Sequence, residues 1–189
     1  TANENCIKDD NFCGLPVVPF EKVESSYPSS EYQMFVAIGY SDLNKKRAGI
    51  FEQAKSKGYK LVSYVHPSVV VVGDFEFGEN CFIFENSVIQ PFVKIGDDVI
   101  VWSGSLISHN TTIKDHCFIA SHVAIAGSST IEPYCFLGTN CTLRNGIKIA
   151  KECVIGAGCV ILEDTKEKEV FVTRSTAIPN FNRDLLKDI

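Results

Sequence analysis

The sequence has no long apolar run, little basic charge and no closely spaced cysteine pair. No stretch approaches the length that a membrane-spanning helix requires, so a membrane protein is not expected. The 18 Lys and Arg residues are outnumbered by 23 Asp and Glu, so the clustered basic face that nucleic-acid binding needs is not expected either. The chain lacks a signal-like basic and apolar opening, so secretion is not expected. It opens on Thr1 instead of Met, and we expect further residues to precede it.

Eight cysteines are present, but no two of them form a CxxC pair. The lack of that spacing argues against a zinc knuckle and against a redox-active pair, and no bound metal is expected. Six of the cysteines, from Cys81 to Cys159, are separated by multiples of six residues. We interpret these six as small buried residues of a protein in the reducing cytoplasm.

A six-residue repeat organises most of the chain. Every sixth residue from Val65 to Ile161 is aliphatic or Phe, at 17 successive positions without an insertion. A second, smaller residue follows each large one after four positions, and this second series runs from Val69 to Thr165. One large and one small inward residue in each hexapeptide is typical of a parallel β-helix. Three hexapeptides form one triangular coil, so residues 18 apart stack on neighbouring coils at about 4.8 Å.

The repeat divides the chain into three parts. Residues 65–165 are predicted to form the β-helix, and residues 166–189 a C-terminal cap or tail with a short helix over 182–187. Residues 1–64 read as a partial α/β unit, resembling part of a Rossmann-like domain. In that unit we expect strands over 34–38 and 59–65 and a helix over 44–57 that ends before Gly58.

His109 is the most informative polar residue of the repeat. It occupies an outward corner position, and Gly127, which is 18 residues further on, should stack directly beside it. A glycine there leaves room next to the imidazole and exposes a backbone N–H. A base beside a donor for a carbonyl oxygen suits acyl transfer, and histidine titrates nearest to neutral pH among the side chains. The alternative is an ordinary solvated histidine next to an ordinary turn glycine.

The sequence resembles the NeuD/PglD family of sugar acyltransferases. The resemblance is carried by Phe35-Val-Ala-Ile-Gly39, by Gly58 to Pro67, by Ile107-Ser-His-Asn110, and by Cys135-Phe-Leu-Gly138 with Val154-Ile-Gly-Ala-Gly158. It implies a trimeric left-handed β-helix enzyme of the cytoplasm, which moves an acetyl group from acetyl-CoA to an amino or hydroxyl group of a sugar, often nucleotide-linked. Acetyl-CoA would then bind between adjacent coils.

The resemblance also implies roles for individual residues. His109 matches the general base, followed by Asn110 where some relatives carry an acidic residue or a second histidine. Gly127 matches the glycine whose amide meets the acetyl carbonyl. Further coenzyme-lining positions fall on Phe118, Thr139 and Ala157, and the loop that begins at Gly39, Tyr40 and Ser41 occupies the place of a sugar-nucleotide loop.

Several other side chains keep two interpretations. Lys45, Lys46 and Arg47 could meet a phosphate group or form a solvated helix face. Trp102 could stack on a nucleobase or lie at a subunit interface. His66, before Pro67, is expected to be structural, and His116 and His122 are expected on the surface.

Two other functions compete with acyl transfer. A γ-carbonic-anhydrase-like zinc enzyme also uses a trimeric left-handed β-helix, but it needs three converging imidazoles, and the separations of 43, 7 and 6 residues between successive histidines fit no 18-residue stack. A non-catalytic β-helix scaffold or regulatory subunit is the second alternative. Trimer formation has its own motive, because outward apolar residues would otherwise face water; they are Phe82, Phe84, Val88, Ile100 and Leu106.

Overall fold

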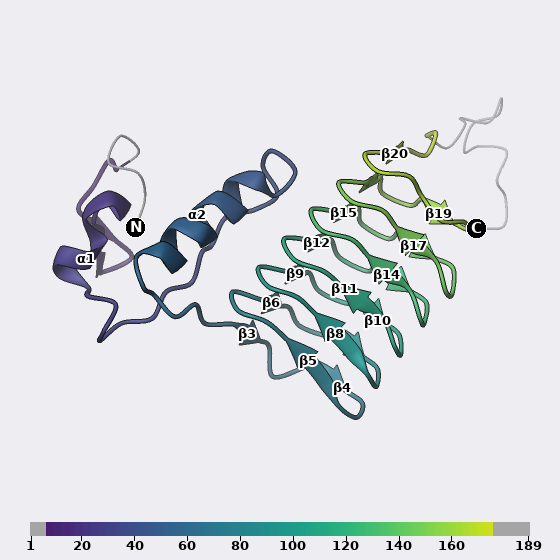
Figure 1. Cartoon of the computed structure of the whole chain (residues 1–189), viewed down its shortest axis with the longest axis horizontal. Helices are drawn as coiled ribbons and strands as arrows, with labels where there is room; N and C mark the ends of the chain where they lie inside the picture. Colours follow the sequence, from purple (N-terminus) through teal and green to yellow (C-terminus); the bar gives the residue numbers. More distant parts are fainter. Residues whose placement is uncertain (1–6, 176–189) are drawn as a thin grey trace, which may run out of the picture.

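The computed structural model describes residues 7–175, and most of them form a triangular prism of stacked coils (Figure 1). Three parallel sheets make the three faces of the prism, and each strand pairs with strands one coil away in the chain. Ile107, for example, pairs with Ile89 and Ile125, which lie 18 residues before and after it. The 18-residue stacking and the left-handed β-helix that the repeat and the resemblance predict are confirmed.

We name the faces by the order in which the chain visits them. Face 1 consists of β3 (Tyr64–Val65), β6 (Phe82–Ile83), β9 (Ile100–Val101), β12 (Phe118–Ile119), β15 (Phe136–Leu137), β18 (Val154–Ile155) and β20 (Val170–Phe171). Face 2 consists of β4 (Val70–Val71), β7 (Val88–Ile89), β10 (Leu106–Ile107), β13 (Ala124–Ile125), β16 (Thr142–Leu143) and β19 (Val160–Ile161). Face 3 consists of β5 (Phe75–Phe77), β8 (Val93–Ile95), β11 (Thr112–Ile113), β14 (Thr130–Ile131) and β17 (Lys148–Ile149). The corners are named by the two faces they join.

The large residues of the repeat form the core, and from Ile83 to Ile161 they are at most 5% exposed. Val71 and Phe77 belong to the same series but are 41% and 43% exposed, because the first coil has no further coil stacked before it. The small series is buried too from Cys81 to Cys159. Within it, the hydroxyl of Thr111 is buried without a hydrogen-bond partner. Within residues 7–175 the cysteines have free thiols. Burial raises the pKa of the Cys81 thiol to about 11 and that of Cys141 to about 12.

Beyond Thr165 the coil continues for one more strand. Val170 of β20 pairs with Val154 of β18, a separation of 16 residues instead of 18, so the last coil is two residues shorter than the others. The short helix expected over 182–187 lies outside the residues that the structure describes. Within residues 7–175, no helix has the length and apolar character that crossing a membrane would demand.

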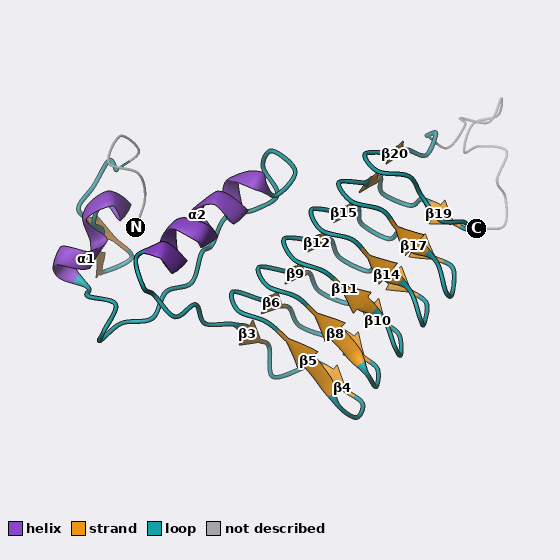
Figure 2. Ribbon diagram, in the orientation of Figure 1, coloured by secondary structure: helices purple, strands orange, loops and turns teal. Residues whose placement is uncertain are grey.

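The N-terminal part packs beside the prism as a smaller unit (Figure 2). It contains a hairpin of β1 (Asn11–Phe12) and β2 (Leu15–Pro16), a 3-10 helix (Phe20–Lys22), α1 (Val23–Ser26) and α2 (Lys45–Ser56). The helix expected over 44–57 is present, but the strand expected over 34–38 is reduced to one parallel bridge between Met34 and Leu61. This segment is attached to the coil instead, because the N–H of Val36 donates to Oδ1 of Asn80 at 2.7 Å.

Helix α2 runs along the corner between faces 3 and 1. Lys45 near its start pairs with Glu152 at 3.1 Å, and Lys55 near its end pairs with Glu79, four coils back. Between these ends Arg47 is fully buried and forms an ion pair with Asp98 at 3.0 Å. Both interpretations offered for Arg47, a solvated helix face and a phosphate contact, are therefore wrong, because this side chain binds the coil.

Candidate active site

The corner between faces 2 and 3 carries the residues expected for catalysis. His109 and Asn110 lie on the turn after β10, and Gly127 lies one coil further on, after β13. A Cβ atom built on Gly127 would lie 2.6 Å from Cε1 and 2.7 Å from Nε2 of His109. The imidazole ring therefore lies directly against the glycine backbone, in the space that any other side chain would need.

His109 and Gly127 differ in their hydrogen bonds. The backbone N–H of His109 donates to Oε1 of Gln90 at 3.0 Å, and the side-chain amide of Asn110 lies 3.3 Å from Nδ1 of the ring. His109 and Asn110 are both exposed. The carbonyl of Gly127 accepts from the N–H of Gly146 at 2.9 Å, whereas its own N–H donates to no group among residues 7–175. The corner thus offers an exposed imidazole and an unused amide donor side by side.

A second histidine and glycine also stack 18 residues apart, a pair that sequence reasoning missed. A Cβ built on Gly104 would lie 2.5 Å from Nδ1 of His122, at the corner between faces 1 and 2. Gly104 has φ of +71°, a left-handed conformation that by itself favours glycine, and its N–H donates to the carbonyl of Glu85 at 3.0 Å. Gly127 is not left-handed, so its backbone does not explain why glycine stands there. Of the two pairs, only the one at His109 has a glycine N–H without an acceptor among residues 7–175.

The other residues expected to line acetyl-CoA fall into two places. Thr139 and Ala157 are exposed at the corner between faces 1 and 2, and they lie on adjacent coils, since the N–H of Gly158 donates to the carbonyl of Thr139 at 2.9 Å. Phe118 lies on face 1, where it stacks on Phe136 with ring centroids 5.6 Å apart. The structure therefore brings Thr139 and Ala157 together and places Phe118 apart from them.

The loop expected to bind the sugar lies on face 1 as well. The ring of Tyr40 rests on Phe118 and Phe136, with both centroid distances 5.0 Å, although Tyr40 remains 58% exposed. Beside it an apolar groove of about 430 Å³ separates the segment before the loop from face 1. The groove is lined by Phe35, Ala37, Ile38, Gly39, Phe82, Phe84, Ile100, Trp102 and Phe118.

Trp102 contributes to this groove through a stacked pair of rings. Its ring is parallel to that of Phe84, with centroids 4.3 Å apart and an interplanar angle of 6°. The indole is 39% exposed, so one side of it remains open to a partner.

Within one chain, the expected base and the expected sugar loop do not meet. The chain passes from face 1 to face 2 to face 3, so the corner between faces 2 and 3, where His109 lies, is opposite face 1 in the triangular cross-section. Tyr40 and Phe118 lie on face 1 itself. A site that uses both sets of residues therefore needs a second copy of the chain.

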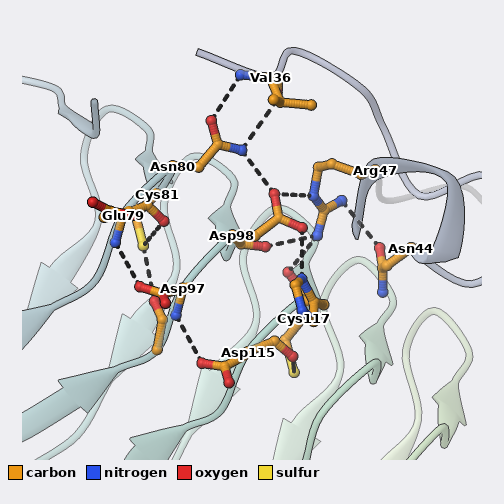
Figure 3. A network of polar contacts seen from close by, with 12 residues as sticks. Val36, Asn44, Arg47, Glu79, Asn80, Cys81, Asp97, Asp98, Asp115 and Cys117 are labelled. Atoms are coloured by element: carbon orange, nitrogen blue, oxygen red, sulfur yellow. Dashed lines mark hydrogen bonds and ion pairs between the residues drawn. The ribbon is translucent and has the colours of Figure 1, made fainter. Parts of the chain in front are cut away.

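A buried polar cluster around Asp98 was not anticipated. His116, expected on the surface, is only 9% exposed, and its Nδ1 lies 2.9 Å from Oδ2 of the buried Asp98 (Figure 3 shows the cluster around this carboxylate). The ring also stacks on Tyr134 and meets the edge of Phe51 from α2. His116 is buried because α2 covers its corner. The hexapeptide repeat alone does not predict how that helix packs.

The histidines of the coil lie on different corners. His66 and His122 lie between faces 1 and 2, His109 between faces 2 and 3, and His116 between faces 3 and 1. In the part of the chain that the structure describes, no three His, Cys, Asp or Glu residues are grouped so that they could hold a metal ion.

Solved structures of several acetyltransferases are similar to this chain. PerB from Caulobacter crescentus, in complex with CoA and GDP-perosamine, is 27% identical, with 86% of this chain and 78% of that chain covered and a TM-score of 0.79. A mutant of GDP-perosamine N-acetyltransferase from the same organism, with the same two ligands, is 26% identical, with 83% and 74% covered and a TM-score of 0.78. The acetyltransferase domain of PglB from Neisseria gonorrhoeae FA1090, in complex with acetyl coenzyme A, shares the fold at 23% identity, with 87% and 79% covered and a TM-score of 0.80.

These neighbours confirm the resemblance to hexapeptide-repeat sugar acetyltransferases. Residues 64–180 also match the family model described as the GMPPB C-terminal domain, a match that spans more than half of the chain. The chain belongs to the GMPPB C-terminal domain family, whose fold is the same left-handed β-helix of hexapeptide repeats.

Proposed function

We propose that the protein transfers the acetyl group of acetyl-CoA to an amino group of a nucleotide-linked sugar, with His109 as the general base. The observation that carries this proposal is the imidazole of His109 packed against Gly127, whose N–H has no acceptor of its own in the described structure. The solved neighbours support the substrates, because their ligands are CoA, acetyl coenzyme A and GDP-perosamine.

Each group at this corner has a distinct task. His109 takes the proton of the attacking amine as nitrogen bonds to the thioester carbonyl carbon. The N–H of Gly127 donates to the carbonyl oxygen as that oxygen becomes negative, and the bond to sulfur then breaks, so that the thiol of coenzyme A leaves with a proton. General-base help contributes about 10²- to 10⁴-fold, and one oxyanion donor about 10²- to 10³-fold. Asn110 orients the ring through Nδ1.

We further propose that the working form is a homotrimer. The outward residues of face 3 are polar or charged: they are Glu76, Lys94, Thr112, Thr130 and Lys148. Those of faces 1 and 2 are mostly apolar, including Phe82 and Ile100 on face 1 and Val88, Leu106 and Ala124 on face 2. Ile100 is already only 9% exposed within one chain. Packing face 1 of one subunit against face 2 of the next would bury what remains exposed of the others and leave the charged face in water.

This packing would complete the site. Face 2 is bordered by the corner that carries His109, and face 1 carries Tyr40 and Phe118. Each cleft between subunits would therefore combine the base of one chain with the sugar loop of its neighbour. Thr139 and Ala157, at the corner between faces 1 and 2, would line the same cleft for acetyl-CoA. Free thiols and a metabolite donor favour a cytoplasmic location for this reaction.

The test is a turnover assay with acetyl-CoA and a panel of nucleotide-linked amino and hydroxy sugars, in which released thiol is measured. We expect acetylation of an amino sugar, and a particle of three 20.9 kDa chains in light scattering. His109→Ala should lower kcat by at least about 10² while acetyl-CoA affinity by calorimetry stays within about twofold. His122→Ala is the matched control, because it removes an exposed corner imidazole that also stacks on a glycine. Equal turnover of both variants would remove His109 from the mechanism.

A further inference from the structure

The sugar loop ends in a backbone conformation that needs external support. Asp42, Leu43 and Asn44 have φ of 53°, 46° and 66°, so three consecutive residues other than glycine are left-handed. Such residues are rare and persist only where their surroundings hold them, most often at functional sites. Leu43 in particular has no short polar side chain that could relieve the strain. Two backbone bonds lie within the turn, from the N–H of Asn44 to the carbonyl of Tyr40 at 3.2 Å and from the N–H of Lys45 to the carbonyl of Asp42 at 3.0 Å, and side-chain contacts from outside it add to them.

One guanidinium group holds both ends of the loop. Nη1 of Arg47 donates to the carbonyl of Gly39 at 3.2 Å and to Oδ1 of Asn44 at 3.2 Å. Asn44, which is fully buried, also donates through its own amide to the carbonyl of Cys135 in the coil at 3.2 Å. The loop between Gly39 and Asn44 is thus held at both ends by one side chain, in addition to its own backbone bond from the N–H of Asn44 to the carbonyl of Tyr40, and it is attached to the prism.

The same side chain is anchored in the coil on its other edge. Nε of Arg47 donates to Oδ1 of Asp98 at 3.0 Å, and Nη2 donates to the carbonyls of Asp98 at 2.9 Å and Cys117 at 3.2 Å. The carboxylate of Asp98 also accepts from Nδ2 of Asn80 at 2.7 Å and lies 2.9 Å from Nδ1 of His116. Figure 3 shows Arg47 between Asn44 on one side and Asp98 on the other. The buried positive charge is therefore compensated and held in one orientation.

A buried ion pair of this kind is weak evidence for stability, because apolar residues of similar size often stabilise a fold as well or better. What a guanidinium adds is geometry, since its planar fork directs several donors at fixed angles. Here those donors fix the position of a strained loop on face 1, where Tyr40 rests on Phe118 beside the apolar groove.

We propose that Arg47 is a positioning residue for the acceptor sugar. It rests on the proposed function: Arg47 touches no substrate, but it sets Gly39, Tyr40 and Ser41 in the place where the acceptor binds. Of the positions assigned to acetyl-CoA, Gly127, Thr139 and Ala157 share no hydrogen bond with this cluster among residues 7–175, and only Phe118 touches the loop, through Tyr40. The effect on acetyl-CoA should therefore be much smaller than the effect on the acceptor.

The test compares Arg47→Lys with a variant of similar stability loss. Lysine keeps the charge opposite Asp98 but lacks the fork that reaches Gly39 and Asn44 together. We expect the KM for the acceptor to rise at least tenfold, while the KM for acetyl-CoA and kcat change less than threefold. Leu61→Val is the control, because Leu61 is buried in the N-terminal core and bridges to Met34, away from the loop. Amide hydrogen exchange of residues 40–44 should accelerate in Arg47→Lys and not in the control.

A second variant keeps the test valid if Arg47→Lys fails to fold. Asn44→Gly suits the left-handed conformation but removes the amide that links Arg47 to Cys135, so it should fold and still raise the acceptor KM. Unchanged acceptor KM in Arg47→Lys and Asn44→Gly, or an equal rise in Leu61→Val, would overturn the positioning role alone. A wild-type protein that acetylates no acceptor would instead overturn the proposed function, and unchanged exchange of residues 40–44 would then also remove Arg47 as the holder of the loop.

Discussion

Replacing Gly127 by Ala tests the proposed site with a single methyl group. The backbone of Gly127 is not left-handed, so alanine can adopt its conformation. The new Cβ would lie 2.6 Å from Cε1 of His109, whereas carbon atoms in ordinary contact are about 3.5–4.0 Å apart. The exposed imidazole must therefore move by about 1 Å, and it has solvent to move into.

A displacement of about 1 Å at a reacting group can cost about 10² in rate, which corresponds to about 2.7 kcal/mol in activation free energy. We expect Gly127→Ala to lose about this factor in kcat/KM for the acceptor, because the ring no longer faces the amide of residue 127. The melting temperature should stay within about 2 °C of wild type, since the ring can yield without disturbing the core.

The assay measures initial rates of thiol release at saturating acetyl-CoA, together with thermal unfolding by circular dichroism. Gly49→Ala is the control, because Gly49 lies in α2 and a Cβ there meets nothing within 4 Å. If Gly127→Ala turned over like wild type, the close approach of ring and backbone would have no catalytic meaning. If both variants lost activity equally, the loss would not come from the site.

Two further outcomes follow from the core. Thr111→Val should raise the free energy of unfolding by about 1–2 kcal/mol, because it removes a buried hydroxyl without a partner, and thermal unfolding measures this; Ser105→Ala, which removes a hydroxyl bonded to Ala120 at 3.0 Å, should not stabilise. The coil cysteines should resist a thiol reagent at about pH 8 in the native protein and react after denaturation. A thiol of pKa about 11, as at Cys81, is only about one-thousandth ionised there, and rapid native labelling would contradict its burial.

The prism could be predicted from the sequence because its signal is periodic. Each hexapeptide buries one large and one small side chain, and 17 repeats leave no doubt about the register between Val65 and Ile161. The pairing of residues 18 apart then follows, and it places His109 against Gly127 before any coordinates are known. What the period cannot supply is contact with elements outside the coil.

Arg47 illustrates this limit. Three adjacent basic residues look like a solvated helix face, yet only Lys45 and Lys46 are exposed. A signal was present: Arg47 lies four residues before Phe51 and seven before Ala54, so it shares the buried face of α2. His116 could have been found too, because it stands 18 residues after Asp98 and must stack beside that carboxylate. Neither signal identifies the partner across the corner, which depends on how the N-terminal unit packs.

Stacking at a fixed interval makes each corner a column of neighbours, so the chemistry of a corner depends on which side chains share its column. One column pairs Asp98 with His116 and packs against α2. Through Arg47, which binds Asp98, this column holds the sugar loop. Another pairs His109 with Gly127 and remains exposed. These two columns stand at different corners, and the loop rests on face 1, opposite the corner that carries His109, so a single chain does not bring the loop to the imidazole. A second copy of the chain can bring them together, because faces 1 and 2 are mostly apolar. If face 2 of the second copy packs against face 1 of the first, its His109 corner lies beside the first copy's Tyr40.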